Sequence, residues 1–233
     1  ILVANKKTIY MCRKCERPHS SEEYNESCFC RNCGKFLSQK DSKHLNQVSI
    51  IEDKKYLNKE EILDLVKKHD KKNLWWIQQE KIVGDELRET MKLSKDNIYK
   101  IIEWKFESNA LVKTVQLNRA KKFDELQLEK VSNQVFNLDE KHDIQRINLL
   151  CLFNGIGPAV ASVILTFFDP DNYCVLDFHV YQEAFGVRPK SLTPEKYVRL
   201  LRRFREEANI HHLRVRDIEK AYFFKNCEMI NVT

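Results

Sequence analysis

Apolar residues recur at helical spacing along most of the chain from about residue 56 onward. Positions three or four residues apart fall on one face of a helix, so this pattern predicts a run of amphipathic helices. Asn58 precedes the first of them and suits its N-cap. The expected helices are Lys59–His69, Glu86–Leu93, Lys95–Phe106, Ala110–Leu128, Glu129–Asn137, Asp143–Phe153, a helix starting at Pro158, Phe178–Phe185, Pro194–Ala208 and Arg216–Lys225.

Two features interrupt the helical pattern. A short aromatic patch at Leu74–Ile77 is followed by Gly84 and Asp85, and we expect this pair to break the chain. The first 40 residues are polar, rich in cysteine and without helical periodicity. The sequence therefore predicts a mainly α protein, with a small metal-binding module at 1–40, a linker at 41–55 and an all-α domain at 56–233.

Composition agrees with this organisation and points to a class of partner. The 233 residues include 5 Gly and 5 Pro, which argues against collagen-like, low-complexity and turn-dense all-β chains. The net charge is +6, and basic residues concentrate in residues 1–50 and in Arg188–Arg216. Two basic zones on an otherwise acidic chain favour a polyanionic partner, and a solvated surface is the alternative.

The sequence predicts no membrane-spanning segment. The longest apolar run, Ala159–Phe168, is much shorter than the roughly 20 residues that span a bilayer. No apolar secretory region follows Lys6 and Lys7. We therefore expect an intracellular, reducing compartment (cytoplasm, nucleoid or nucleus), in which the 8 cysteines are thiols or metal ligands rather than disulfides.

Four of the cysteines have the spacing of zinc ligands. Cys12 and Cys15 form one Cys-x-x-Cys pair, and Cys30 and Cys33 form a second pair that Gly34 follows. Each pair presents two thiolates to one metal ion, and four thiolates complete a tetrahedral Zn²⁺ site of the closed, structural kind. The arrangement resembles a zinc ribbon, in which the metal stabilises a module too small for a core of its own.

Other residues of this module leave alternatives open. Cys28 and His19 could each replace a ligand, although four cysteines already satisfy Zn²⁺. Basic residues interleave with the cysteines, which fits contacts with phosphates, and ribbons that dock proteins are basic too. Nucleic acid and a protein partner are therefore both compatible with the ribbon. The remaining cysteines, Cys151, Cys174 and Cys227, are expected to be small core residues.

A glycine-containing turn separates two of the predicted helices. Asn154-Gly155-Ile156-Gly157, here called the elbow, follows Asp143–Phe153, and Pro158 suits the first turn of the next helix. Glycines permit positive φ and a close approach of the backbone. Free N–H groups at the positive end of a helix form a phosphate-binding geometry. We therefore expect Asn154, Gly155, Ile156 and Gly157 to contact DNA.

A second motif follows the elbow after one helix and a short extended stretch. It reads Leu176-Asp177-Phe178-His179-Val180. Together the two motifs resemble the helix-hairpin-helix DNA glycosylases of the endonuclease III and oxoguanine glycosylase superfamily, in which a Val-Asp-x-His-Val motif follows the hairpin. The resemblance covers 56–225 as helical architecture and 143–181 as specific motifs. It implies a glycosylase-like fold, double-stranded DNA as the partner and a role in base-excision DNA repair.

The resemblance also implies that Asp177 is catalytic. Cleavage of the bond between a base and its sugar develops positive charge on the sugar. A fixed carboxylate stabilises that charge and orients or deprotonates a water molecule. Asp177 also suits the N-cap of Phe178–Phe185, so a structural role is an alternative that is compatible with catalysis. His179 is expected to pack or to orient rather than to transfer protons.

The chain departs from this family in two places. Bifunctional members carry a lysine two residues after the second hairpin glycine, and its amine forms a Schiff base with the sugar. Ala159 stands at that position, so we expect a monofunctional hydrolase with no lyase step unless another lysine reaches the site. The family's iron–sulfur cluster needs four C-terminal cysteines, and that end has only Cys227, so no iron–sulfur cluster is expected.

The C-terminal basic zone and the large aromatic residues supply further candidates. The arginines of Pro194–Ala208 are expected to lie largely outside its apolar stripe, where they could grip phosphates or form a solvated face. Enzymes that act on a base in a duplex extrude it and often hold it between aromatic faces, although most large aromatics are core residues. The expected DNA contacts are Arg199, Arg202 and Arg203, with Arg205 beside them, and the base-pocket candidates are Trp75, Trp76, Trp104 and His179. Glu103 and Lys105, which flank Trp104, receive no role from the sequence.

These features together predict a monofunctional DNA glycosylase. It would bind double-stranded DNA and hydrolyse the N-glycosidic bond of a damaged or modified base, with Asp177 assisting and one structural Zn²⁺ in the ribbon. The first alternative is a non-catalytic DNA-binding protein with the same two modules. The second is a protein-interaction scaffold in which the ribbon docks a partner.

Overall fold

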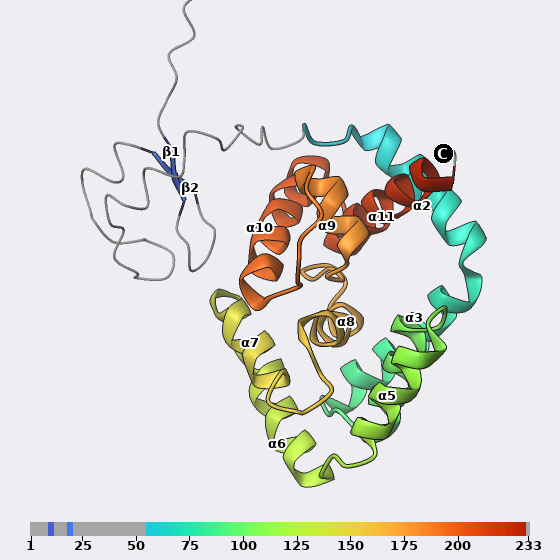
Figure 1. Cartoon of the computed structure of the whole chain (residues 1–233), viewed down its shortest axis with the longest axis vertical. Helices are drawn as coiled ribbons and strands as arrows, with labels where there is room; N and C mark the ends of the chain where they lie inside the picture. Colours follow the sequence, from blue (N-terminus) through green and yellow to red (C-terminus); the bar gives the residue numbers. More distant parts are fainter. Residues whose placement is uncertain (1–8, 12–17, 21–54, 232–233) are drawn as a thin grey trace, which may run out of the picture. The chain divides into compact units, whose positions relative to one another are not determined.

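The computed structural model describes residues 9–11, 18–20 and 55–231 (Figure 1). The chain divides into two units, Ile1–Glu52 and Asp53–Thr233. In the first unit, β1 (Ile9–Met11) and β2 (Pro18–Ser20) pair antiparallel, with Tyr10 opposite His19. The predicted zinc ligands Cys12, Cys15, Cys30 and Cys33 lie outside the described residues, as does Cys28, and of His19 the backbone alone is described.

The second unit is built from helices, which confirms the prediction of a mainly α protein. Its elements are α2 (Lys59–Lys72), α3 (Leu74–Thr90), α4 (Lys95–Lys105), α5 (Ala110–Ala120), α6 (Glu125–Phe136), the 3-10 turn η3 (Glu140–His142), α7 (Asp143–Leu150), α8 (Pro158–Phe168), α9 (Phe178–Phe185), α10 (Pro194–His211) and α11 (Val215–Asn231). The expected cap at Asn58 forms, since its side chain accepts a hydrogen bond from the first turn of α2. Ser94 and Thr193 cap α4 and α10 in the same way.

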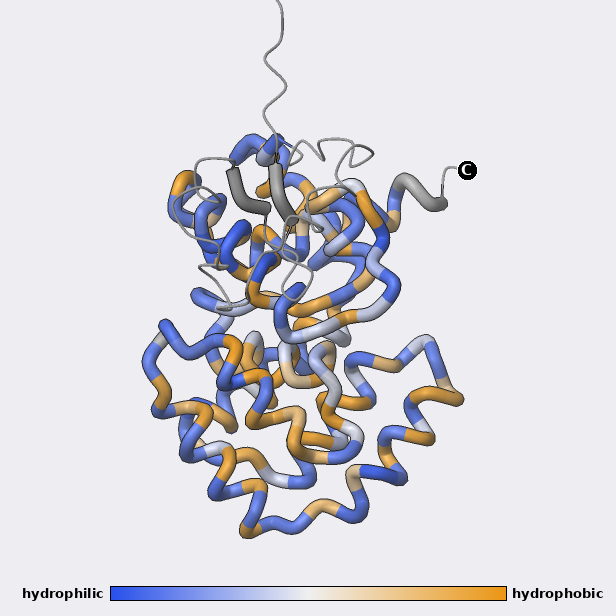
Figure 2. Tube along the Cα trace, turned by 60° about the vertical axis from the view of Figure 1, so that its left-hand side comes forward, coloured by the Kyte–Doolittle hydropathy of each residue, from blue (hydrophilic) through white to orange (hydrophobic). Residues whose placement is uncertain are grey.

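Helix α8 lies at the centre of this unit (Figure 1). It packs against α3, α4, α7 and α10, and its residues from Val160 to Phe167 are all buried. A helix that is apolar on all sides is stable only where other elements cover every face. The helices around α8 alternate apolar and polar residues along the trace (Figure 2), as expected when one face packs inward and the other meets water.

The remaining helices form three groups around α8. Helices α2, α9 and α10 pack against α11, whereas α3, α4 and α5 follow one another on the other side, and α6 packs against α7. Ion pairs join the groups: Arg216 of α11 pairs with Glu80 of α3 at 2.8 Å, and Arg205 of α10 pairs with Asp143 of α7 at 2.5 Å. The segment that carries Asp177 leads from the central helix α8 to α9, which packs on α11.

Helix α3 corrects the prediction of a chain break. Leu74–Thr90 forms one helix that runs straight through Gly84 and Asp85. A Cβ atom on Gly84 would lie 2.6 Å from the carbonyl oxygen of Phe167 in α8, so the missing side chain lets the two helices pack closely. Glycine costs a helix interior about 1 kcal/mol, and burial of this face offsets that cost.

The region after α4 also differs from its prediction. The sequence pattern indicated one helix over Ala110–Leu128, but α5 ends at Ala120 and α6 begins at Glu125. Asp124 caps α6 by accepting a hydrogen bond from the backbone N–H of Gln127 at 2.8 Å. Phe123 fills the turn between the helices, where its ring packs 5.2 Å from that of Phe153. A buried aromatic and a capping carboxylate thus replace about one turn of helix.

Candidate active site

The elbow forms as the sequence predicted. α7 ends at Leu150, and α8 begins at Pro158, with Gly157 as its N-cap. Ile156 is 2 % exposed and anchors the turn in the core, while Asn154 and Gly157 lie on the surface. No side chain caps α8, so the first N–H groups of this helix remain available to an external acceptor.

Helix α5 lies directly beside the elbow. Gly155 has φ +125°, and a Cβ atom there would lie 3.0 Å from Cβ of Arg119 and 3.4 Å from Oε1 of Gln116. Arg119 itself is exposed, so this contact brings a cationic side chain to the elbow. The buried Oε1 of Gln116 has no hydrogen-bond partner among the described residues. The sequence analysis missed both residues, since they precede the elbow by more than thirty positions.

Asp177 stands at the start of α9 and uses both carboxylate oxygens. Oδ1 accepts a hydrogen bond from the backbone N–H of His179 at 2.8 Å, which is the predicted N-cap. Oδ2 lies 2.9 Å from the Nζ atom of Lys105. Just before it, the N–H of Leu176 donates to Oγ of Ser162 in α8 at 2.8 Å. The extended segment is therefore tied to the central helix, and the Asp177 side chain keeps 20 % of its surface exposed.

The charge state of Asp177 follows from its neighbours. Burial alone would raise the pKa of this carboxyl group. The positive charge and hydrogen bond of Lys105, together with the His179 N–H, outweigh burial and hold the pKa below its ordinary value. Asp177 is therefore an ionised, partly exposed carboxylate at neutral pH.

Lys105 is the main addition that the structure makes to this site. It is the last residue of α4, and its side chain is 10 % exposed. Its Nζ atom also lies 3.5 Å from the carbonyl oxygen of Leu176. Lys105 and Asp177 are 72 positions apart, so no local pattern signals the pair. The sequence offered one indication that Lys105 lies near a functional site, its position next to Trp104, but this position assigned no chemical role to the lysine.

His179 is held by α11 rather than left free in a cavity. Its Nδ1 atom lies 2.9 Å from Oδ1 of Asn226, an oxygen that only accepts, so Nδ1 is the donor in this contact. The edge of its ring packs against Phe223. Burial, and then the nearby Asp177 carboxylate, raise the pKa of the Cys227 thiol one residue further along α11. α4, α9 and α11 thus converge around Asp177.

The tryptophans divide between the core and the surface. Trp104 is 8 % exposed, and its ring packs edge-on against Phe167 at 5.1 Å. Trp104 and Trp76 are linked reciprocally, since each indole N–H donates to the backbone oxygen of the other at 3.0 and 3.1 Å. Trp75 is 42 % exposed and meets the edge of Trp76. Among the three, Trp75 therefore has the ring face that an incoming base could reach most easily.

The arginines of α10 differ from one another: the sequence predicted that they lie largely outside the buried stripe, and Arg203 is the exception because it is buried. Arg203 is 7 % exposed, with its guanidinium 4.7 Å from the ring of Tyr56. Arg205 binds Asp143 and donates to the backbone oxygen of Asn172 at 3.0 Å. Arg199 lies over the ring of Phe185 at 4.3 Å, and Arg202 is exposed. The guanidinium groups of Arg199, Arg203 and Arg205 thus each lie over an aromatic ring.

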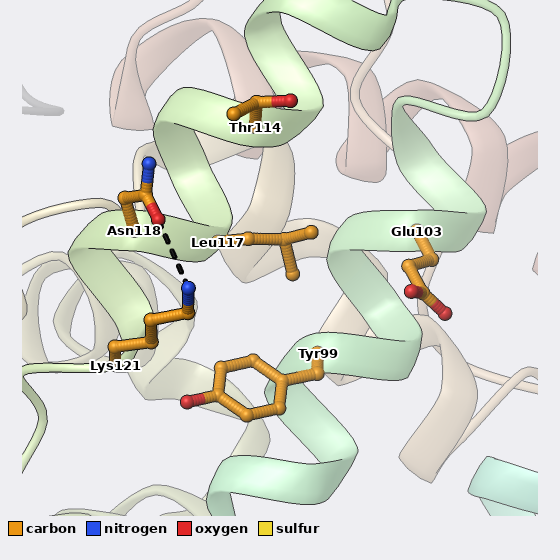
Figure 3. Close-up of a pocket in the computed structure, with 6 residues that line it drawn as sticks. All are labelled: Tyr99, Glu103, Thr114, Leu117, Asn118 and Lys121. Carbon is orange, nitrogen blue, oxygen red and sulfur yellow. Dashed lines mark hydrogen bonds between the residues drawn. The ribbon is translucent and has the colours of Figure 1, made fainter.

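A separate pocket of about 280 Å³ lies between α4 and α5 (Figure 3). Its lining combines the apolar side chain of Leu117 with polar groups from Tyr99, Glu103, Thr114, Asn118 and Lys121. Lys121 donates to Oδ1 of Asn118 at 3.2 Å. Asp177, Lys105 and the elbow do not line this pocket, so it is distinct from the site around Asp177.

The described residues contain no cluster of His, Cys, Asp or Glu that could hold a metal ion. Cys174 is buried and Cys151 is partly buried, and burial raises the pKa of both thiols. Cys151 reaches a pKa of about 11, so both thiols are protonated at neutral pH. Within the same part of the chain, no helix has the length and apolar character needed to cross a membrane.

Comparison of the chain with protein-family models, with curated proteins and with solved structures found no match.

Proposed function

We propose that this chain binds double-stranded DNA at the elbow and hydrolyses the N-glycosidic bond of a damaged or modified base, with Asp177 assisting. The observation that carries the proposal is the placement of Asp177: an ionised carboxylate, 20 % exposed, on the segment that follows the elbow helix. Base removal needs a duplex to be held and a negative charge to face the sugar. The elbow would hold the duplex, and Asp177 would supply the negative charge.

The elbow supports the DNA-binding part of the proposal. Gly157 is exposed and no atom lies within 4 Å of the place where its Cβ would be, so a phosphate can approach the backbone closely. The positive end of α8 favours an anion there. Arg119, beside Gly155, adds a charge that would pair with a neighbouring phosphate.

The carboxylate supports the catalytic part. As the base leaves, the sugar approaches an oxocarbenium ion, and a fixed negative charge lowers the energy of that state. A carboxylate oxygen of Asp177 can also orient a water molecule for attack at C1′ of the sugar, the carbon from which the base departs. Lys105 and the His179 N–H keep Asp177 ionised, and these contacts also fix its position.

A zinc ribbon formed by Cys12, Cys15, Cys30 and Cys33 is part of the same proposal. Four thiolates suit a closed tetrahedral Zn²⁺ site, which has no open position for water. The metal would hold the small N-terminal unit together and take no part in base removal. The basic residues between the ligands would add contacts with phosphates or with a protein partner.

One observation favours a non-catalytic DNA-binding protein as the second candidate. Both oxygens of Asp177 already have partners, the capping N–H of His179 and the ammonium of Lys105. A carboxylate that caps a helix and pairs with a lysine can be retained for stability alone. In that case the elbow would bind DNA while no bond is broken.

The experiment that separates the two candidates measures base release and duplex binding on the same samples. Duplexes that each carry one damaged or modified base are incubated with the wild type and with Asp177→Asn, which keeps a side-chain oxygen to cap α9. The glycosylase proposal expects a free base from at least one duplex, lost in Asp177→Asn while duplex affinity is retained. Duplex binding without release from any substrate would favour the second candidate.

A further inference from the structure

The pocket between α4 and α5 is a second concave site, which the proposed base removal does not use. It has a volume of about 280 Å³ and is lined by Tyr99 and Glu103 of α4 and by four residues of α5. Pockets that enclose drug-sized ligands begin at about 300 Å³. The volume therefore suits a ligand with one small ring system, and a dinucleotide cofactor would be too large.

Apolar and polar side chains both line this pocket (Figure 3). The Tyr99 ring and the Leu117 side chain lie between the two helices and supply apolar surface. Asn118 and Lys121 lie on the α5 side, where Nζ of Lys121 donates to Oδ1 of Asn118 at 3.2 Å, and Glu103 lies on the α4 side. An amide that accepts through its oxygen can still donate through its NH₂ group. An aromatic ring is thus combined with hydrogen-bond donors and an acceptor.

A nucleobase would use all of these groups, whereas simpler ligands would not. A base stacks on an aromatic ring through either of its faces, and its edge carries donors and acceptors together. A carboxylate such as that of Glu103 accepts a hydrogen bond from an exocyclic amino group, and an amide such as that of Asn118 pairs with donors or acceptors. An aliphatic ligand would leave the polar groups without partners, and a simple anion would be repelled by Glu103.

Helix α5 separates this pocket from the elbow. Gln116 and Arg119 of α5 lie beside Gly155 of the elbow, whereas Leu117 and Lys121 line the pocket. At about 100° per residue these two pairs lie on roughly opposite sides of the helix, which is about 10–12 Å across. A DNA strand that leaves the elbow would cross this width in about three nucleotides, at about 3.4 Å each. The pocket is therefore within reach of DNA held at the elbow.

We propose that this pocket binds an unpaired nucleobase, stacked on Tyr99, with the polar edge of the base toward Glu103 and Asn118. The base belongs to a single-stranded tail beside the duplex, and this part of the inference rests on the proposed binding of DNA at the elbow. The same chemistry would bind a free deoxynucleoside monophosphate, with its phosphate at Lys121. The base in this pocket is not the one removed at Asp177, because Asp177 does not line the pocket.

The first arm of the test compares a blunt duplex with the same duplex carrying a short single-stranded tail, using the full chain. Iodouracil in the tail forms a covalent bond under ultraviolet light with an aromatic ring stacked on it. We expect tighter binding of the tailed duplex and a cross-link that peptide mass spectrometry maps to Tyr99. Tyr99→Leu keeps an apolar side chain against the core but removes the ring, so affinity for the tailed duplex should fall about tenfold. Affinity for the blunt duplex should not change.

The second arm titrates free deoxynucleoside monophosphates into the full chain by calorimetry. We expect binding that is weakened in Lys121→Ser and in Glu103→Gln, two exposed residues of the lining. Lys122→Ser is the matched control, since Lys122 is exposed and adjacent in sequence but does not line the pocket. It should keep the wild-type affinity for nucleotides and the wild-type ratio of affinities for the tailed and blunt duplexes. Nucleotide binding without a tail effect would make a free nucleotide the source of the base.

Each outcome decides the proposal. It is overturned if no nucleotide binds and the tail either adds no affinity or cross-links outside the pocket, and these readings need only the wild type, even if Tyr99→Leu fails to fold. Nucleotide binding that neither Lys121→Ser nor Glu103→Gln weakens lies elsewhere and counts against it. Nucleotide binding at the pocket without binding of either duplex would remove the DNA-binding role of the elbow and leave the pocket standing. Equal binding of both duplexes with no nucleotide binding would do the reverse.

Discussion

The ammonium of Lys105 lies 2.9 Å from the carboxylate of Asp177 and joins the end of α4 to the start of α9. This contact links the group of helices that contains α4 to the group that contains α9, and it keeps a largely buried carboxylate ionised. The contribution of this contact to stability can be measured apart from its chemical role, because unfolding is measured without DNA.

Removal of the ammonium should make the protein sensitive to acid. The pKa of Asp177 is lowered in the folded chain, so the pair stabilises the fold above the ordinary pKa of an aspartate and loses this effect as pH falls through the lowered value. In Lys105→Met, the hydrogen bond from the His179 N–H is left to oppose burial without the ammonium, so the carboxyl group takes up a proton at higher pH. We expect a loss of about 2 kcal/mol near neutral pH, because an unpaired buried charge is costly.

Urea denaturation of Lys105→Met across a pH series measures both effects. Lys81→Met is the matched control, since it removes an exposed ion pair with Asp85 at 2.5 Å on the surface of α3. Exposed pairs contribute little, so this variant should unfold like the wild type. Equal acid sensitivity in the two lysine variants would show that the Asp177 pair is not what holds the carboxylate ionised.

The two elbow glycines should respond differently to alanine. Gly155→Ala forces a Cβ into a backbone with φ +125° and to within 3.0 Å of Arg119. We expect it to lose about 2 kcal/mol of stability. Gly157→Ala meets open space at an ordinary φ of −85°, so its thermal midpoint should match the wild type. Its methyl group would still obstruct a phosphate, and duplex affinity should fall. Unchanged affinity in Gly157→Ala would show that DNA does not approach this amide.

Arg119 should contribute to DNA binding in a salt-dependent way. The Cβ and Cδ atoms of Arg119 lie beside Gly155 of the elbow and the residue is exposed, so we expect the guanidinium to contact a phosphate. Arg119→Ala should weaken binding to duplexes of any sequence and reduce the slope of log affinity against log salt by about 1. Affinity is measured by fluorescence anisotropy over a salt series, with the exposed Lys67→Ala of α2 as the control. If log affinity falls with log salt at the same slope in Arg119→Ala and in Lys67→Ala, the DNA does not contact Arg119.

The close packing of α3 on α8 predicts that a better helix former will destabilise the protein. Alanine at position 84 would place its Cβ 2.6 Å from the carbonyl oxygen of Phe167, which also accepts a hydrogen bond from the Arg88 guanidinium. We expect Gly84→Ala to lose about 2 kcal/mol through overpacking, despite its higher helix propensity. Glu89→Ala, exposed on the same helix, should keep the wild-type thermal midpoint. A stabilised Gly84→Ala would contradict the packing explanation.

The zinc prediction depends on the sequence alone and can be tested by metal analysis. We expect one Zn²⁺ per chain, lost or weakened in Cys30→Ser and in Cys33→Ser. Cys28→Ser is a control from the same segment and should retain the metal. Loss of zinc in Cys28→Ser with retention in Cys30→Ser would show that Cys28, and not Cys30, is the ligand. The absence of zinc from the wild type would contradict the prediction of a zinc ribbon.

Local features of this fold were predictable from the sequence, because their causes lie within a few residues. Asn58, Ser94 and Asp177 cap the helices that directly follow them. The elbow needs a positive φ at Gly155 and a proline at the start of α8, and both are visible in five consecutive residues.

Features set by packing between distant segments were not predictable in the same way. Gly84 reads as a helix break until the backbone of α8 is placed against it. Arg203 reads as a surface cation, yet its guanidinium packs between Tyr56 and Phe185. Lys105, the partner of Asp177, lies 72 positions earlier at the end of α4. The apolar pattern of α4 predicts which face of the helix is buried, but not which distant residue its last lysine contacts.

The most direct test of the account is a structure of the chain bound to a duplex that carries a stable abasic-site analogue. We expect a phosphate oxygen at about 3 Å from the backbone N–H of Gly157 or of its neighbour in α8. The same duplex should place the sugar of the analogue against the Asp177 carboxylate and the Lys105 amine. A duplex bound on another face, with the elbow and Asp177 both left in water, would contradict the account.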